Sequence, residues 1–452
     1  MSSSESVASA PAAVGRKFWF VELADGISRS NFATLLYSAF TAIGLLAFVA
    51  VSTPYVLNVY LKDVVDPSEH GQIAGDLAAW NEIALLLVFG PAGIIADRIG
   101  RSQVFTVGFI FMGIAYALYP FADSVVELTG YRIVYAIGIG LATAMLQTII
   151  ADYPANASRG KATALVGTLN GLGVIVLTVG LGGLMKSFVG RGQDAETAGY
   201  IVHFLISGLC FLSALVVAIG LKKGTVVNRE QRPPLLELVR SGFAAARNPR
   251  IALAYACAFI ARGDLVVIGT FVNLWGTNAG IAAGLDPAEA TAKGRLLFGA
   301  ATGAGLVWLP VMGYMLDKVN RVTGTIICMT LAALGFLFTD MVDDPLQKES
   351  LVYFILLGIG QISAFVGAAT LIGQEAPPAT RGAVVGLLNL SGAVGILLCT
   401  AVGGRLFDAI GPHAVFELVG GITVLVVLFA IWVRWKAPGP MTTGGAFMGG
   451  GH

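Results

Sequence analysis

The hydrophobic pattern of the chain consists of long apolar segments separated by short polar turns. A helix needs roughly 20 mostly apolar residues to cross the hydrocarbon core of a bilayer, which is about 30 Å thick. Segments of this length are expected at about 34–60, 73–97, 103–122, 127–152, 161–189, 199–221, 250–277, 295–316, 322–341, 351–374, 383–407 and 413–434. None alternates apolar and polar residues as barrel strands do. The pattern predicts an all-α membrane protein with twelve transmembrane helices.

Composition supports this prediction. Hydrophobic residues make up 56% of the chain and charged residues 12%, with a mean hydropathy of +0.79, whereas about 25% of residues are charged in soluble domains. The net charge of +1 gives no reason to expect nucleic acid as a partner. The four cysteines and four histidines are scattered, so no metal, cofactor or disulfide is expected. The lipid bilayer is the expected surrounding.

A polar stretch near the middle of the chain divides the spans into two groups of six. The expected organisation is an N-terminal segment (1–33), a six-helix half (34–221), a linker (222–249), a second six-helix half (250–436) and a tail (437–452). The linker contains a predicted amphipathic helix from Leu235 to Ala246 that would lie on the membrane surface. The first 17 residues, "MSSSESVASAPAAVGRK", are expected to be a disordered lead and not a cleavable signal peptide.

Loop charges predict the orientation of the protein. An even number of spans puts both termini on one side, and that side carries most of the loop Lys and Arg, including Arg98, Arg101 and Arg159. The positive-inside rule then places both termini and the linker in the cytoplasm of a plasma (inner) membrane protein.

The second half repeats landmarks of the first about 220 residues later. The stretch "GIIADRIGR" (Gly93 to Arg101) corresponds to "GYMLDKVNR" (Gly313 to Arg321). In the same way "DYPANASRG", which begins at Asp152, corresponds to "EAPPATRG", which begins at Glu375. The two halves are therefore expected to be structural repeats.

This pattern resembles the major facilitator superfamily of secondary transporters over essentially the whole chain. The signature loop of that family between helices two and three, G-x-x-x-D-R-x-G-R, is matched in full by Gly93, Asp97, Arg98, Gly100 and Arg101. A helix-four pattern centred on Arg132 is matched only in part, and the Gly-Pro pair of many proton-driven exporters is absent from helix five. The resemblance implies two six-helix halves around a central cavity.

The signature loop is expected to act in gating. A carboxylate at Asp97 is predicted to cap the N-terminus of helix eleven, near Thr380 to Ala383, when the cavity opens outward. Arg101 is predicted to pair with Asp152. The alternative is that these charges only anchor a cytosolic loop, which explains the two arginines but not Asp97. The expected gating residues are Gly93, Asp97, Arg98, Gly100, Arg101, Asp152 and Arg159, with Gly313, Asp317, Arg321, Glu375 and Arg381 in the second half.

Four charged residues lie inside predicted spans, where ionisable groups are functional candidates: Glu82, Arg132, Arg262 and Asp264. The repeat does not mirror them. Glu82 and Arg132 lie at similar depth and are expected to pair, either as a proton-coupling switch or as a static ion pair. Arg262 and Asp264 point about 200° apart around their helix, so they cannot form one site. Two cations in a cavity favour an anionic substrate.

The expected function is secondary active transport of a small organic, possibly anionic, solute by alternating access, with protons as the coupling ion. Two alternatives remain: a proton-antiporting drug or metabolite exporter, and a non-transporting receptor or sensor. No P-loop, metal cluster or nucleophile arrangement indicates an enzyme. The protein is expected to be a monomer.

Overall fold

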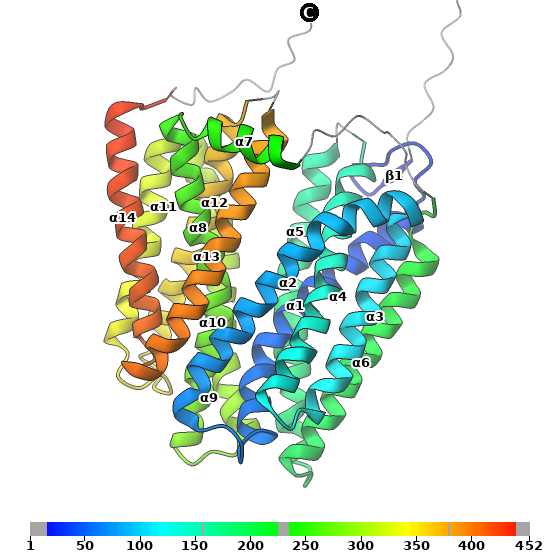
Figure 1. Cartoon of the computed structure of the whole chain (residues 1–452), viewed down its shortest axis with the longest axis vertical. Coiled ribbons are helices and arrows are strands. Elements are labelled where there is room, and N and C mark those ends of the chain that lie inside the picture. The colour runs from blue at the N-terminus through cyan, green and yellow to red at the C-terminus, as the bar shows by residue number, and fades with distance from the viewer. Residues whose placement is uncertain (1–15, 156–157, 225–234, 378–379, 440–452) are drawn as a thin grey trace, which may run out of the picture.

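The computed structural model describes residues 16–155, 158–224, 235–377 and 380–439, with residues 235–239 and 263–265 described in backbone only. The first 15 residues of the predicted lead and residues 440–452 of the predicted tail lie outside the described residues. The chain forms two bundles of long helices (Figure 1). The N-terminal half contains α1 (Arg29–Val59), α2 (His70–Ile99), α3 (Arg101–Leu118), α4 (Val125–Asp152), α5 (Arg159–Val189) and α6 (Ala195–Gly220), with the short helices η1 (Pro67–Glu69) and η2 (Tyr119–Phe121).

The C-terminal half repeats this plan after a short helix, α7 (Leu235–Ala245), which lies at one end of the molecule (Figure 1). Its elements are α8 (Pro249–Val267), η4 (Ile268–Val272), α9 (Asn273–Ala282), α10 (Pro287–Lys318), α11 (Arg321–Leu337), η5 (Phe338–Met341), α12 (Leu351–Glu375), α13 (Arg381–Ala409) and α14 (Ala414–Lys436). We call the end of the molecule that carries α7 the linker face, and the opposite end the closed face.

Eleven helices within the described residues are long and apolar enough to cross a membrane. The seventh predicted span, 250–277, is built differently, because α8, η4 and α9 follow one another without a break. The middle element, η4, is a π-helical turn, and the Asn273 side chain donates to the carbonyl of Gly269 at 2.7 Å within it. Together these elements supply the twelfth membrane segment.

The segment before α1 has more structure than the sequence suggests. Strands β1 (Lys17–Phe18) and β2 (Val21–Glu22) form a small hairpin, and Leu23 pairs with Pro154 after α4. The first helix then begins at Arg29, where Ser28 and Asn31 exchange side-chain and backbone hydrogen bonds of 3.0 and 3.1 Å. This capping box satisfies amide groups that a helix N-terminus leaves free. The first helix therefore begins five residues before the predicted start of the first span at residue 34.

Small residues allow the helices of each half to pack closely. Gly138 of α4 lies against the backbone of Gly108 and Met112 in α3, where an added Cβ would come within 2.7 Å of an amide nitrogen. Such close approach increases van der Waals contact between helices, which stabilises bundles in lipid. Large apolar side chains point outward on the other faces, as Leu215 and Leu425 do at 57% and 64% exposure. The outer surface is therefore suited to lipid.

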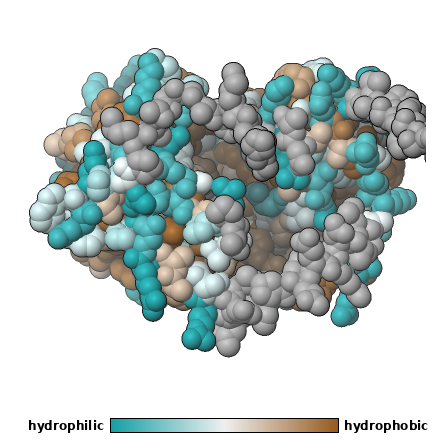
Figure 2. Space-filling view, turned by 90° about the horizontal axis from the view of Figure 1, so that it is seen from above, coloured by the Kyte–Doolittle hydropathy of each residue, from teal (hydrophilic) through white to brown (hydrophobic). Residues whose placement is uncertain are grey.

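The two halves meet at the closed face and diverge toward the linker face (Figure 1). Viewed from the linker face, the molecule is hollowed between the two halves (Figure 2). The contacts between halves include those of α2 with α13, of α5 with α10, and of α1 with α9 and α10. This arrangement positions every candidate site described below.

Candidate functional site

The closed face is sealed where α2 meets α13. The Asp408 carboxylate accepts hydrogen bonds from the backbone N–H groups of Gly71 and Gln72, at 2.8 and 2.6 Å. These amides belong to the first turn of α2, where no helical carbonyl is available to accept their hydrogens. Beside them, Arg405 of α13 pairs with Asp76 of α2 at 2.8 Å. The C-terminal end of α13 therefore caps the N-terminus of α2 across the two halves.

Glycines allow the main chains of these helices to touch. Gly71 lies against the backbone of Gly404, and Gly75 lies against the carbonyl of Thr400. A Cβ at either glycine would overlap the opposite main chain. The close contact between α2 and α13 thus requires glycine, which has no side chain, at both positions.

A second seam joins α5 to α10. Lys186 and Glu289 form an ion pair of 3.0 Å near the closed face. Deeper in the same seam, Arg295 of α10 lies over Gly182 of α5 and is only 8% exposed. Farther along, the Leu306 side chain of α10 lies against Gly171. Both seams are shut near the closed face, and the cavity between the halves opens toward the linker face (Figure 2).

A carboxylate and a guanidinium from different halves lie within electrostatic range of each other near the middle of their helices. Glu82 of α2 is 6% exposed, and the charged group that acts on it is Arg262 of α8. The Arg262 guanidinium donates to the Asn389 side chain of α13 at 2.9 Å. Its aliphatic stem lies over Gly392, where an added Cβ would come within 2.9 Å of Cγ. Glu82, Arg262 and Asn389 form what we call the central polar cluster.

The structure corrects the expected pairing of Glu82 with Arg132. Arg132 is 6% exposed inside the N-terminal half, and the groups that act on its charge are the hydroxyls of Tyr116, Tyr119 and Tyr135. Its Nη1 donates to the Tyr119 hydroxyl at 3.4 Å, and its guanidinium lies 5.5 Å from the Tyr135 ring centroid. Depth along two helices cannot reveal which neighbours share a face, which is why the sequence suggests the wrong partner.

Asp264 is the fourth charged candidate. Its side chain lies outside the described residues, so the structure places only its backbone, in α8 two residues after Arg262.

The signature loop lies at the linker face, between α2 and α3. Arg101 and Asp152 form an ion pair there, between the start of α3 and the end of α4. Gly100 has φ +104°, a left-handed conformation that favours glycine and makes the tight turn possible. Asp97 and Arg98 are exposed at the end of α2, and Gly93 is half-buried one turn earlier. Arg159 is exposed and begins α5.

The equivalent loop of the second half is connected differently. Arg321 bonds within its own corner, to Asp317 at 3.4 Å and to the Leu316 carbonyl at 2.8 Å. Glu375, the counterpart of Asp152, instead pairs with Arg250 at the start of α8, at 2.8 Å. Arg381 donates to the carbonyl of Gly373 at 3.1 Å. Gly313 is half-buried in α10.

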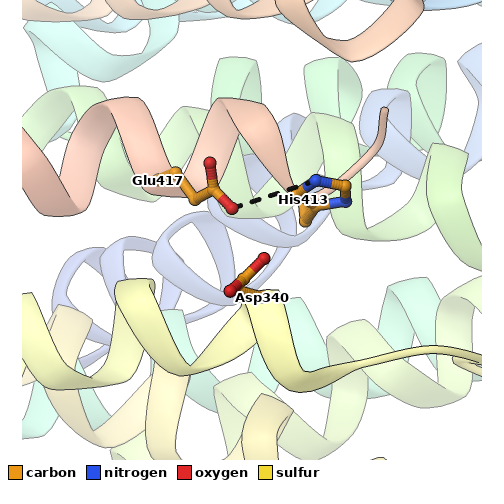
Figure 3. A group of neighbouring side chains, drawn as sticks. All are labelled: Asp340, His413 and Glu417. Carbon is orange, nitrogen blue, oxygen red and sulfur yellow. Dashed lines mark ion pairs between the residues drawn. The ribbon is translucent and has the colours of Figure 1, made fainter. Parts of the chain in front are cut away.

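One group of described residues has the geometry of a cation site. The ligand atoms of Asp340 in η5 and of His413 and Glu417 at the start of α14 lie within 4.8 Å of one another (Figure 3). His413 and Glu417 are 3.9 Å apart, and their side chains are 35% and 38% exposed. The sequence does not reveal this group because Asp340 is distant from the other two along the chain.

Sequence reasoning missed the residues that close the seams. The predicted spans 295–316 and 383–407 put Arg295 and Arg405 at or near span boundaries, where cations are expected to meet water. In the structure both lie within helices and contact the opposite half. Pairs of glycines on α2 and α13 were the available signal for close contact between these helices.

Curated relatives of the chain include two magnetosome proteins of Paramagnetospirillum magneticum. MamH is 26% identical over 411 residues, covering 89% of this chain and 92% of MamH. MamZ is 26% identical over 428 residues, covering 91% of this chain but only 64% of MamZ. The chain thus spans less than two thirds of the length of MamZ.

Solved structures share the fold. The nucleoside transporter NupG superposes with a TM-score of 0.68 at 16% identity, covering 89% of this chain and 98% of NupG. The sequence profile of the Major Facilitator Superfamily matches residues 18–292 and 266–449. These two matches cover nearly the whole chain, and the protein belongs to the Major Facilitator Superfamily of transporters.

Proposed function

We propose that the protein moves a small anionic organic solute across the membrane by alternating access, together with protons. The observation that carries this proposal is the central polar cluster: Glu82 is buried in one half within electrostatic range of Arg262 of the other half, which donates to Asn389 at 2.9 Å. Charged groups inside a membrane protein are costly, at roughly 2.5–3.5 kcal/mol each on the insertion scale, and they mark substrate or proton pathways.

The cluster suggests how proton and solute binding are linked. While Glu82 is ionised, its charge compensates that of Arg262. Protonation of Glu82 removes that compensation and leaves the guanidinium free to bind the carboxylate or phosphate group of a solute. Asn389 is exposed beside Arg262 and offers both donors and an acceptor to the same solute. Proton and anion would then bind together and leave together.

The linker face and the closed face would open in turn during alternating access. The closed face is held by contacts between halves, while the linker face is open. Breaking the α2–α13 and α5–α10 seams and joining the halves at the linker face would present the cluster to the other side. The loop charges favour a cytoplasmic linker face, so this arrangement would be open to the cytoplasm.

Transport into proteoliposomes tests the proposal. The full-length protein is reconstituted, a pH gradient is imposed, and labelled anionic, neutral and cationic solutes are screened. We expect gradient-driven accumulation of an anionic solute, lost in Glu82→Gln while exchange of labelled for unlabelled solute is kept. The matched control is Glu349→Gln, an exposed acid away from the cluster.

Three outcomes would contradict the proposal. Accumulation by Glu82→Gln equal to that of the unaltered protein would remove the coupling role. Transport of amphipathic cations alone would favour a drug exporter. Binding of a solute without transport would favour a receptor.

A further inference from the structure

The α5–α10 seam holds a buried cation that the proposed transport cycle does not use. Arg295 extends from α10 onto α5, where a Cβ at Gly182 would come within 2.8 Å of its Nη1. Nη1 has no hydrogen-bond partner among the described residues, although the residue is only 8% exposed. A buried guanidinium nitrogen without an acceptor is costly, and this cost at Nη1 points to a ligand in another state.

Three other cations between the halves lie near a carboxylate. Lys186 pairs with Glu289, Arg405 pairs with Asp76, and Arg262 lies within electrostatic range of Glu82. Within the described residues no carboxylate forms an ion pair with Arg295, although its guanidinium is buried in the seam. Its positive charge therefore stays uncompensated within the described part of the chain.

Thr291 supplies a second donor beside Arg295. It lies one turn nearer the closed face on α10, and residues four apart on a helix are neighbours on its surface. Thr291 is 2% exposed, and its hydroxyl also has no partner among the described residues. A guanidinium fork and a hydroxyl group match the oxygens of a carboxylate or phosphate.

The position of these residues sets the side from which a ligand would reach them. Arg295 lies eight residues into α10, about 12 Å from the closed end of that helix. The Lys186–Glu289 pair covers the seam between Arg295 and the closed face. Separation of α5 from α10 would expose Arg295 to a crevice that opens on the side opposite to the present cavity.

We propose that Arg295 and Thr291 form an oxyanion site that becomes accessible when the closed face opens, and that this site takes up the carboxylate or phosphate group of the solute from that side. The inference rests on the proposed transport function and adds a binding site to it. Arg262 would serve the linker side, and Arg295 would serve the opposite side.

Thermal melting of the full-length protein in detergent tests the site, with inorganic phosphate and acetate as probes at constant ionic strength. A ligand that binds only the folded protein raises its Tm by mass action. We expect phosphate or acetate to raise the Tm of the unaltered protein, and Arg295→Gln to need at least about tenfold more of that ion for the same shift. Arg191→Gln, which removes an exposed arginine near the same face, should respond as the unaltered protein does.

Two further variants keep the test decisive if Arg295→Gln fails to fold. Arg295→Lys keeps the charge but loses the fork, and Thr291→Val removes the hydroxyl at nearly constant volume. Both should weaken the response to the ion. Responses of all Arg295 and Thr291 variants equal to that of the unaltered protein would overturn the site.

Cross-linking tests the access route. The described cysteines, Cys210, Cys257, Cys328 and Cys399, are all buried, so a bifunctional thiol reagent should join only the introduced thiols of Lys186→Cys/Glu289→Cys. The cross-linked protein should lose the anion response, and a response that survives cross-linking would exclude access through this seam. An increase in Tm with anion that depends on Arg295, found without solute transport, would support the site and contradict the transport proposal. Anion transport without such an increase in Tm would support the transport proposal and contradict the site.

Discussion

Asp408 accepts a hydrogen bond from the main-chain N–H of Gln72 at 2.6 Å, although the two residues belong to different halves of the molecule. The same carboxylate accepts from Gly71, so one side chain at the end of α13 satisfies two amide groups in the first turn of α2. The predicted contact of Asp97 with the start of helix eleven is the reverse arrangement: a carboxylate at the end of α2 would cap the start of α13. Each helix would thus be capped by the other, one at each face.

Replacing Asp408 should loosen the closed face. Asp408→Asn retains the shape but removes the charge, and charge-assisted hydrogen bonds are worth about 1.5–3 kcal/mol each. We expect the population that is open at this face to rise by roughly tenfold or more. Reaction of Val51→Cys, a fully buried position beside Gly182, with a water-soluble thiol reagent measures this population.

The matched control for this change is Asp343→Asn, which removes an exposed carboxylate from the loop between α11 and α12. Labelling of Val51→Cys should not change in that background. Equal labelling rates with and without the Asp408→Asn substitution would mean that the carboxylate does not hold the face shut.

A methyl group at position 75 should prevent α2 and α13 from coming into contact at the closed face. Gly75→Ala would drive Cβ into the Thr400 carbonyl, and neither main chain can move aside within a helix. The halves should therefore separate there, and the distance between spin labels at Lys62 and Lys348 should lengthen. Gly303→Ala is the control, because nothing lies within 4 Å of that Cβ. Unchanged distances in Gly75→Ala would show that the seam tolerates the methyl group.

The stem of Arg262 needs the space above Gly392. Gly392→Ala should displace the guanidinium from Asn389 and raise the KM for an anionic solute by roughly tenfold, about 1.4 kcal/mol of binding. Gly386→Ala on the same helix meets no atom within 4 Å and should leave the KM unchanged. A similar KM in both variants would separate Arg262 from solute binding.

Binding of one proton with each monovalent anion moves no net charge. Transport should then follow the pH gradient and be indifferent to a membrane potential set by potassium and valinomycin. The proteoliposome assay checks this by applying each gradient alone. A rate that rises with the potential would require more protons per solute or a different coupling ion.

The two corner ion pairs at the linker face should differ in strength. The Glu375 side chain is 7% exposed and the Asp152 side chain 34%, and removal of one partner from a buried pair is the more costly change. Glu375→Gln should therefore lower the free energy of unfolding more than Asp152→Asn does, as measured by denaturant titration of the full-length protein. Exchanging the two residues, in Arg101→Asp/Asp152→Arg, should recover part of the free energy of unfolding that is lost when the more exposed pair is broken.

The sequence predicts the helices of this protein well because a bilayer imposes length and hydropathy on each span. The hydrophobic pattern does not locate charged residues near helix ends correctly. It puts Arg295 at the boundary of a span, although this residue is buried between the halves. Depth also fails to identify partners, since Glu82 and Arg132 lie at similar depth but face different helices. Contacts between halves, such as Asp408 with Gln72, depend on three-dimensional packing that local patterns do not contain.

Salt should affect the closed face less than its charges suggest. The Arg405–Asp76 and Lys186–Glu289 pairs are partly exposed, and ions in solution weaken such pairs within a Debye length of about 8 Å at physiological ionic strength. The contact between Gly75 and the Thr400 carbonyl carries no net charge and involves only main-chain atoms of Thr400. The closed face is therefore expected to stay shut at high ionic strength as well as at low ionic strength.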